Sequence, residues 1–435
     1  MGARAADQTG YKALVCVNFA GGLDNHDLLI GHDQPSYDLW TAGRQALVDL
    51  IDNGPTPGIR ARDNLLRLNP TNNGDFGGRD FAMPPELSGI RNLFEDGKLA
   101  IVPNVGPLIE PVNRTTFFNG SALLPRRLRS HNDQASTWQA LETEGARMGW
   151  GGLMLDAFTQ DSPYTAISLA GQSVFVSGNR SRQTIIPPSG QVREAYGTNG
   201  NAKGSARIAQ ILQDYYQNAA ANATNPMMRD YIRLQGEAIN TSGQAAAILN
   251  TQNLGDSVVV PNNPLSEQLG TVANMIAARD QFGINRQVFF VELGGFDVHR
   301  DHATVIPRLF EQLSVALTNF QDALDTAGLG DMVTTFTMSE FGRTLVANAN
   351  GTDHGWGGHH LVMGGAVRGR QIYGDIPTYD LDGDQVDPRG SLLPQIAIEQ
   401  MGSDLGSWFG LTPSDLDTVF PNRGRFDTTP LGLFT

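Results

Sequence analysis

The stretch Leu14-Val15-Cys16-Val17-Asn18-Phe19 leads into Gly21-Gly22-Leu23-Asp24-Asn25-His26, and this order of residue types occurs a second time in the chain. The second copy is the apolar run 288–291 followed by Gly294-Gly295-Phe296-Asp297-Val298-His299. In each copy the apolar run predicts a buried strand, the glycine pair allows a sharp turn, and an acid and an imidazole stand two residues apart. Because ligand crevices in open α/β sheets lie beyond the carboxyl ends of the strands, the two copies predict one shared polar site.

Carboxylate and imidazole groups are ligands of first-row metals, so the shared site is a candidate metal site. An acid after two glycines is also common turn chemistry, and each copy taken alone favours a turn over a site. The matching strand context of the two copies favours the metal site.

Composition limits the classes of function. The 435 residues are 40% hydrophobic and 17% charged, which is typical of a globular chain with a substantial core. A formal net charge of -14 argues against a nucleic-acid partner, and no apolar run approaches the length of a membrane span. The only cysteine, Cys16, lies in the first apolar run, which favours a small core residue over a nucleophile and excludes a disulfide within the chain.

Alternating strand and helix patterns predict an α/β fold with a mostly parallel sheet flanked by helices, as a single domain over residues 1–435. The clearest unit is the strand 288–291, a helix over 304–324 with one apolar face, and the strand 332–336; strands joined by such a crossover run parallel. Further strands are expected at 99–102, 166–169, 174–176 and 361–363, and further helices at 37–51, 86–94, 130–141, 149–158 and 392–401.

Residues 185–285 are expected to form a helical insertion or cap. A loop rich in Pro, Gly, Ser and Asn over 184–204 precedes three helical patterns, which cover 206–221, 226–249 and 264–282. We expect this block to wall the pocket at the carboxyl edge of the sheet.

A third strand end also carries an acid. The strand 332–336 leads into Ser339-Glu340-Phe341-Gly342-Arg343, and Gly351-Thr352-Asp353-His354-Gly355 follows. Seven of the eight histidines stand in polar segments near these strand ends or near Ser130, so we expect them to serve a site and not the core.

These segments, with 361–374, Gly295-Phe296-Asp297-Val298-His299 and Ser130-His131, resemble the bacterial domain of unknown function family 1501. The resemblance runs from about Leu14 to Phe420 in the family's order. It implies a fold similar to the alkaline phosphatase and sulfatase superfamily and an exported protein, often with a twin-arginine leader. Ala3-Arg4-Ala5 resembles the small-x-small site where an export signal is removed, although an ordinary terminus has the same composition. We expect a periplasmic or extracellular protein whose leader is absent from this chain.

The resemblance also implies site residues. That superfamily binds two metals at the carboxyl edge of its sheet and has a nucleophile at a helix N-terminus. By position, the resemblance implies Asp24, Asp297, His299 and His354 as metal ligands and Ser130 as the nucleophile. The neighbouring His26, Glu340 and Asp353 are further expected metal ligands, and His131 and Arg343 are further expected catalytic residues. Ser130 would be the nucleophile at a helix start that favours anions; its spacing to Asp133 equally fits a helix cap.

Two positions depart from the family pattern. Phe341 stands where active phosphatases and sulfatases carry a histidine, so either the pair Asp353 and His354 completes the ligand set or the site holds one metal or none. His26 is particular to this chain and is either an added ligand or a turn residue. Arg343 either places a guanidinium near an anion or neutralises Glu340.

The resulting expectation is an exported metal-dependent hydrolase of phosphate or sulfate esters. Its cofactor would be a divalent metal, zinc or manganese first, and its substrate a small anionic ester or a sulfated or phosphorylated glycan. The alternative is a non-catalytic exported protein on the same fold with a degenerate metal site, which binds a ligand or assembles with itself as a homo-oligomer.

Overall fold

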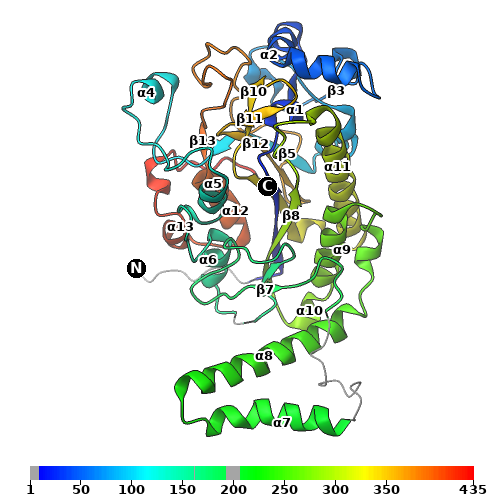
Figure 1. The fold of residues 1–435 in the computed structure, drawn as a ribbon, viewed down its shortest axis with the longest axis vertical. Coiled ribbons are helices and arrows are strands. Elements are labelled where there is room, and N and C mark those ends of the chain that lie inside the picture. The colour runs from blue at the N-terminus through cyan, green and yellow to red at the C-terminus, as the bar shows by residue number, and fades with distance from the viewer. Residues whose placement is uncertain (1–8, 161, 193–205) are drawn as a thin grey trace.

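A mostly parallel sheet forms the centre of the protein (Figure 1). The computed structural model describes residues 9–160, 162–192 and 206–435. In spatial order the strands are β13 (Ile396–Ala397), β5 (Leu99–Gly106), β12 (Gly358–Met363), β9 (Val333–Ser339), β1 (Lys12–Ala20), β8 (Arg286–Gly294), β6 (Ala166–Ser168) and β7 (Thr184–Ile185). Within the described residues, β12 is the strand of this sheet that runs antiparallel to its neighbours, so the predicted α/β class with a mostly parallel sheet is confirmed.

The first quoted run is the central strand. β1 pairs in parallel with β8 on one side and with β9 on the other, and seven of its nine residues are buried. The crossover from β8 through α11 (His302–Thr326) to β9 therefore passes over β1 and joins parallel strands, as the sequence predicts. Ala20 of β1 is in register with Gly294 of β8, so the two glycine pairs leave the sheet side by side.

Helices cover both faces of the sheet because the buried side chains of β1 alternate between two cores. Val15 and Val17 pack in the same core as Leu313 of α11, whereas Cys16 packs in the same core as Met154 and Met401 on the other face. On the first face lie α3 (Ser88–Glu95), α9 (Pro264–Ala277) and α11; on the second lie α5 (His131–Ala140), α6 (Trp150–Asp156), α12 (Ile398–Phe409) and α13 (Pro413–Val419).

Two small sheets and several further helices lie around the central sheet. Two small sheets are formed by β2 (Ile30–Gly31), β4 (Phe81–Met83) and β3 (Leu66–Arg67), and by β10 (Arg343–Ala347) and β11 (Thr352–His354). The remaining α-helices are α1 (Asn25–Leu28), α2 (Gln34–Asp52), α4 (Arg114–Phe118), α7 (Ala206–Asn222), α8 (Pro226–Leu249) and α10 (Arg279–Phe282). Short 3-10 turns are η1 (Arg62–Asn64), η2 (Asn73–Phe76), η3 (Pro85–Leu87), η4 (Leu254–Ser257), η5 (Gly330–Met332) and η6 (Arg423–Arg425).

Two predicted elements differ from the structure. Residues 174–176 form a turn and not a strand, because Phe175 lies against the start of α6, where its carbonyl oxygen accepts a hydrogen bond from Gly152. Its ring packs on Trp150 with 4.6 Å between ring centroids. The predicted helix over 392–401 begins only at Ile398, since Ile396–Ala397 first pairs with β5.

The predicted insertion 185–285 divides into two parts. α9 is buried against α11 and β8 and belongs to the core. α7 and α8 form a hairpin that extends from the end of the molecule opposite α1, β10 and β11 (Figure 1). The expectation that this block walls the site is therefore wrong for the hairpin, which lies at the amino-terminal edge of β8. Among the described helices, none has both the length and the apolar character needed to cross a membrane.

A buried ion pair fixes the turn after β1. Asp24 is fully buried, and its carboxylate accepts hydrogen bonds from both terminal nitrogens of Arg44, at 2.5 and 2.6 Å, and from His302 Nε2 at 2.6 Å. It also accepts from the backbone nitrogens of His26 and Asp27 at the start of α1. Burial alone would raise the pKa of Asp24, but Arg44 and His302 hold that pKa well below its usual value.

Arg44→Ala should lower the free energy of unfolding by about 3–5 kcal/mol, because it leaves a buried carboxylate without its cation. Urea unfolding followed by circular dichroism measures the loss. The matched control is Arg67→Ala, which removes an exposed arginine from its pair with Asp80 and should cost less than about 1 kcal/mol. Equal losses for the two variants would contradict the role assigned to Arg44.

Candidate metal centre

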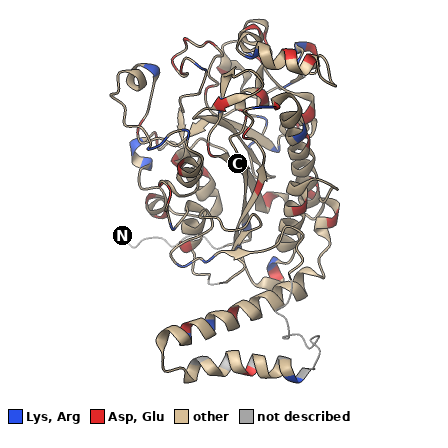
Figure 2. Cartoon of the chain, in the orientation of Figure 1, with Lys and Arg blue, Asp and Glu red and all other residues tan. Residues whose placement is uncertain are grey.

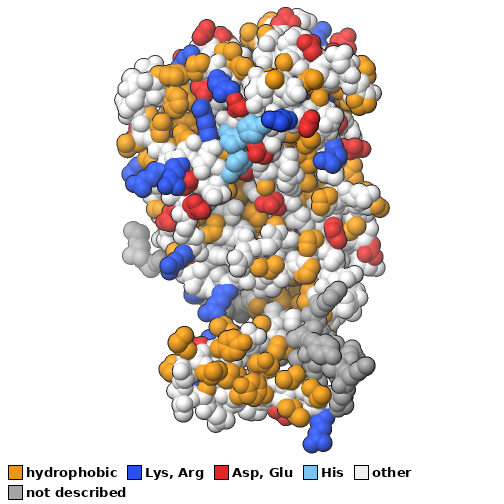
Figure 3. Space-filling model, viewed as in Figure 1, with side chains coloured by type: hydrophobic (Ala, Val, Ile, Leu, Met, Phe, Trp, Pro, Cys, Tyr) orange, Lys and Arg blue, Asp and Glu red, His pale blue; other side chains and the backbone are white. Residues whose placement is uncertain are grey.

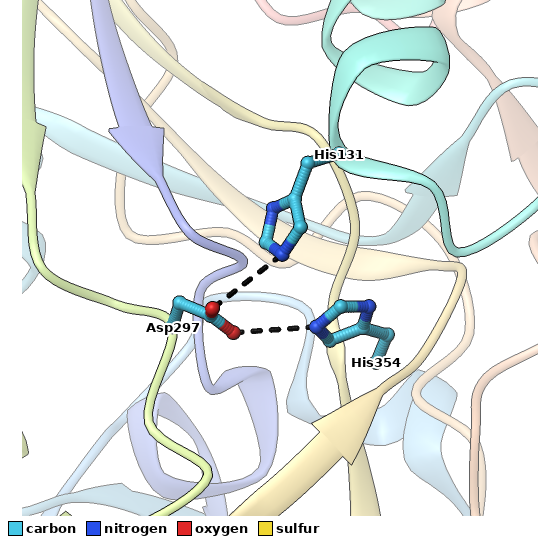
Figure 4. A group of neighbouring side chains, drawn as sticks. All are labelled: His131, Asp297 and His354. Atoms are coloured by element: carbon cyan, nitrogen blue, oxygen red, sulfur yellow. Dashed lines mark hydrogen bonds and ion pairs between the residues drawn. The ribbon is translucent and has the colours of Figure 1, made fainter.

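Three side chains from separate segments converge beyond the carboxyl edge of the sheet (Figure 4). Asp297 follows β8, His354 ends β11, and His131 is the first residue of α5. Their ligand atoms all lie within 4.8 Å of one another. The Asp297 carboxylate stands between the two rings, 3.5 Å from His131 Nε2 and 3.2 Å from His354 Nε2.

His299 extends this group. Its Nε2 lies 2.9 Å from His354 Nε2 and 3.1 Å from Asp297 Oδ1. The four side chains, His131, Asp297, His299 and His354, are called the histidine cluster below. In Figure 3 the histidines of one face gather in a single patch in the upper part of the molecule.

Two rings of the histidine cluster have an acceptor at Nδ1, and the Nδ1 atom of the third lies near a carboxylate. His131 Nδ1 donates to Glu340 at 3.0 Å, and His354 Nδ1 donates to the carbonyl oxygen of Arg129 at 2.8 Å. His299 Nδ1 lies 3.4 Å from Asp353 Oδ1. A histidine that binds a metal usually donates its other ring N–H to a carboxylate or a backbone carbonyl, and this arrangement fixes the orientation of the ring.

The resulting proton positions leave lone pairs facing one another. A neutral His354 that donates from Nδ1 has a lone pair on Nε2, and this atom faces the Asp297 carboxylate. The same holds for His131, whose Nδ1 donates to Glu340. Burial is the largest of the effects that lower the pKa of His354, which favours its neutral form. Converging lone pairs of this kind repel one another unless a proton or a cation lies among them.

Glu340 and Asp353 hold the rings from behind. Glu340 Oε1 accepts a hydrogen bond from the backbone nitrogen of Gly21 at 2.6 Å as well as from His131. Asp353 accepts from Asn348 at 2.6 Å and pairs with Arg389. Partial burial raises the pKa of Asp353, but the Asn348 and Arg389 contacts lower it further, so the net direction is downward. The two predicted ligands therefore orient histidines in this structure.

Arg343 is buried and holds Asp297 in place. Its Nη2 donates to Asp297 Oδ1 at 2.7 Å and to the carbonyl oxygen of Phe296 at 3.0 Å. Nη2 also donates to the carbonyl oxygen of Gly21, Nε donates to that of Gly22, and Nη1 donates to that of Thr352. Although partial burial raises the pKa of Asp297, the bond and the charge of Arg343 lower it overall. With no exposed surface, Arg343 acts through Asp297 and is a positioning residue in place of the predicted catalytic one.

The glycine pairs make this packing possible. Gly21 has φ +114°, and a side chain there would overlap the backbone nitrogen of Asp297. At Gly22, with φ +91°, a Cβ would lie 2.5 Å from the ring of Phe341. Phe341 itself stacks on His354 with 4.4 Å between ring centroids and lies 5.0 Å from the His131 ring. Phe341, at the position where the resemblance to phosphatases and sulfatases led us to expect a histidine, therefore packs against two histidines.

Ser130 stands at the N-cap position of α5, but its side chain makes no capping bond to the backbone. Its hydroxyl donates to Asp133 Oδ2 at 2.9 Å, which matches the spacing seen in the sequence. Ser130 therefore stands at the helix start, directly before His131, without capping the helix.

The structure does not bring Asp24 and His26 into the histidine cluster. Asp24 is held by Arg44 and His302, as described above. His26 is buried with its Nε2 2.8 Å from the carbonyl oxygen of Gly390, and burial lowers its pKa to about 3. Both residues belong to the turn between β1 and α1, which supports the site. The Asp24 carboxylate caps the start of α1 and therefore points into the protein.

Sequence reasoning missed three supporting residues, Arg44, His302 and Arg129. His302, His359 and His360 are buried together with His26, so the expectation that the histidines serve a site in loops is wrong for these four. No sequence motif indicated that His302 and Arg44 bind Asp24. Arg129 has a left-handed backbone conformation, with φ +71°, and its carbonyl oxygen accepts the hydrogen bond from His354 Nδ1. Every residue type has a backbone carbonyl, so the sequence does not indicate this contact.

Arg343→Lys should lower the free energy of unfolding by at least about 2 kcal/mol. A lysine offers three donors for the five acceptors that Arg343 satisfies, and each buried acceptor left unpaired costs about 1–3 kcal/mol. Urea unfolding measures the loss. Arg423→Lys, at an arginine that pairs with the exposed Asp417, is the control and should change stability by less than about 1 kcal/mol. An unchanged Arg343→Lys protein would contradict the positioning role.

A search of curated proteins found no sequence similar to this chain. Among solved structures, the chain is similar to a crystal structure of Ps i-CgsB in complex with k-i-k-neocarrahexaose, at a TM-score of 0.37 and 10% identity, over 94% of this chain and 74% of that one. A second crystal structure of Ps i-CgsB matches at the same TM-score and identity, over 95% and 74% of the two chains.

The family model described as "Protein of unknown function (DUF1501)" matches residues 92–405, which is well over half of the chain. The match includes α5 with His131, the turn after β8, and β11, so all members of the histidine cluster lie inside the matched region. The protein therefore belongs to the DUF1501 family.

Proposed function

We propose that the histidine cluster binds one divalent metal ion and that the protein hydrolyses phosphate or sulfate esters with it. The observation that carries the proposal is the convergence of His131, His354 and Asp297, with each ring held by a partner at Nδ1 and facing the carboxylate with Nε2. Nothing else in the described part of the chain combines this many metal-ligating atoms in one place.

The spacing of the ligand atoms is close to that around a small metal ion. Ligands about 2.0 Å from a tetrahedral metal lie roughly 3.3 Å apart; His131 Nε2 lies 3.5 Å from Asp297 Oδ2, His354 Nε2 lies 3.2 Å from Asp297 Oδ1, and the three ligand atoms lie within 4.8 Å of one another. Three protein ligands with an open fourth position are typical of catalytic zinc sites, and His299, with Nε2 2.9 Å from His354 Nε2, would be a further protein group near such an ion. Mixed imidazole and carboxylate ligands favour zinc or manganese over calcium or magnesium.

Arginines around the histidine cluster favour an anionic substrate. Arg129, 45% exposed, contributes the carbonyl that holds His354, and Arg389, 53% exposed, pairs with the Asp353 that lies behind His299. Arg127, 71% exposed, stands before the start of α5. Guanidinium groups bind phosphate and sulfate oxygens in pairs of hydrogen bonds. Each of these arginines is paired with an aspartate, and an ester anion would share its guanidinium group with that aspartate.

The residues of the chain have separate tasks in this proposal. A bound divalent cation would polarise the ester and make a coordinated water more acidic. His131, His354 and Asp297 would hold that cation, and the rim arginines would orient the ester anion. Ser130 starts the helix that carries His131, and its hydroxyl donates to Asp133, so we assign it to positioning in place of nucleophilic attack.

The proposal includes the finer expectations drawn from the family resemblance. We propose a fold of the alkaline phosphatase and sulfatase type, an exported protein, and a substrate that is a small anionic ester or a sulfated or phosphorylated glycan. The support is the mostly parallel sheet with metal-ligating side chains at its carboxyl edge.

A second candidate function is a non-catalytic protein that binds a metal without turnover. It is favoured by the stacking of Phe341 on His354, which places an apolar ring where the superfamily has a ligand. The two candidates make the same prediction for metal binding and opposite predictions for ester hydrolysis.

The purified protein should bind one equivalent of Zn²⁺ or Mn²⁺, measured by calorimetry and by elemental analysis. Asp297→Asn and His354→Ala should each weaken binding at least about 100-fold, and Glu340→Gln about 10–100-fold because a neutral amide oxygen is a weaker acceptor for the His131 Nδ1–H than a carboxylate. His32→Ala alters a half-buried histidine outside the cluster and should leave affinity unchanged. Absence of stoichiometric binding, or equal effects of His32→Ala and His354→Ala, would refute the metal centre.

The metal-loaded protein should hydrolyse 4-nitrophenyl phosphate or 4-nitrophenyl sulfate, and chelation should abolish the activity. Ser130→Ala should lower turnover less than about tenfold, whereas loss of a nucleophile costs about 10⁴-fold or more. A metal-loaded protein that turns over neither ester supports the non-catalytic candidate. A loss of about 10⁴-fold in Ser130→Ala would make Ser130 the nucleophile.

A further inference from the structure

The α7–α8 hairpin exposes an unusual amount of apolar surface. Among the described residues, seven of the sixteen large hydrophobic side chains that are exposed lie on this hairpin. Their exposed fractions range from 41% to 82%; they are Ile208, Ile211, Tyr215, Met227, Met228, Tyr231 and Leu234. Figure 3 shows this surface as a dense apolar group on the part of the molecule that projects from the body.

The apolar residues of α7 form two rows, and α8 covers one of them. Leu212, Tyr216 and Ala219 are half-buried, and Gly236 of α8 comes close to Tyr216. Ile208, Ile211 and Tyr215 also recur at spacings of three and four residues beside this row and are exposed. A helix with a wide apolar stripe is stable when the whole stripe is covered, and no described residue buries this second row of α7.

Within the described residues, the hairpin packs into the main core through the end of α8. Ala245 and Leu249, near the end of α8, belong to the main core, and Tyr164 donates a hydrogen bond to the carbonyl oxygen of Thr241. The exposed large hydrophobic side chains of α8 all lie in its first nine residues, away from this attachment. The apolar surface is therefore presented at a distance from the sheet and its ligands.

The exposed area is sufficient for a stable interface. Large side chains present roughly 150–250 Å² each, so seven that are on average about half exposed leave roughly 700 Å² uncovered. A standard interface buries about 800 Å² on each partner, and exposed patches of several hundred Å² mark interaction sites.

The charge of the hairpin favours a second copy of the protein as its partner. The hairpin contains three arginines and three acids, interspersed along both helices (Figure 2): Arg207, Arg229, Arg233, Asp214, Asp230 and Glu237. It is neutral within a chain of net charge -14, so two hairpins can approach without the repulsion that separates the bodies. Helices that bind membrane surfaces carry an excess of Lys and Arg on the polar face, which this hairpin lacks.

We infer that two copies of this protein pair through their α7–α8 hairpins and form a four-helix bundle. The same patch on each subunit meets its counterpart across a two-fold axis, the commonest symmetry of homo-oligomers. Because the hairpins lie opposite the histidine cluster, both candidate metal centres remain open at the far ends of the dimer (Figures 1 and 3). The inference is independent of the proposed hydrolase activity.

Sedimentation equilibrium of the whole chain, from about 1 to about 100 µM, tests this inference. The wild-type protein should be a dimer over the upper part of this range. The double variant Ile211→Glu with Leu234→Glu should raise the dissociation constant at least about 100-fold, because each charge would be buried in the bundle.

The matched control is Leu123→Glu with Leu39→Glu, whose side chains are 57% and 42% exposed against 56% and 41% for the test pair. The control should remain dimeric, and circular dichroism with Zn²⁺ binding checks that both variants are folded. A monomeric wild-type protein, or equal dissociation of both variants, would overturn the inference. The wild-type protein could instead be a monomer that floats with vesicles of phosphatidylethanolamine and phosphatidylglycerol, while the hairpin variant does not float. This result would overturn the inference and identify the hairpin as a membrane-binding surface.

Discussion

The guanidinium of Arg343 is the contact on which the candidate site depends. It is fully buried and donates to backbone carbonyl oxygens after β1, after β8 and in β11, and to the carboxylate of Asp297. A single planar cation therefore joins three strand ends that are distant in the sequence. The cost of burying its charge is offset because Asp297 is paired with it and the carbonyl dipoles point toward it. The same contacts place the Asp297 carboxylate between His131 and His354.

The two acids of the repeated phrase have opposite surroundings. Asp24 is enclosed by Arg44 and His302 and fixes the turn after β1, whereas Asp297 is 47% exposed and faces two rings. The Asp24 carboxylate accepts five hydrogen bonds inside the fold, which leaves no lone pair for a metal. Asp297 is paired with the buried Arg343 through Oδ1, and its Oδ2 faces His131. Similar local sequence therefore produces a structural ion pair in one copy and a candidate ligand in the other.

The apolar hairpin and the histidine cluster occupy opposite ends of the molecule (Figures 1 and 3). Because of this separation, a partner bound at the hairpin would not block access to the histidine cluster. Residues 185–285 interrupt the chain between β7 and β8, yet β8 resumes the sheet next to β1 because α9 packs into the core and returns the chain to the sheet. An extension at this position changes the surface of the protein and leaves the carboxyl edge unchanged.

The sequence by itself determined the α/β class, the central strands at 14–19 and 288–291, and the helix over 304–324, because continuous apolar runs and helical spacing depend on neighbouring residues. It also identified Asp297, His299 and His354 as members of one polar site, since parallel strands end at the same edge. Only the tertiary structure decided that Asp24 pairs with Arg44, that Glu340 holds His131, and that Arg129 contributes a carbonyl. These partners lie 20 to 225 residues apart, and which acid meets a cation and which faces an open site depends on packing that local patterns do not encode.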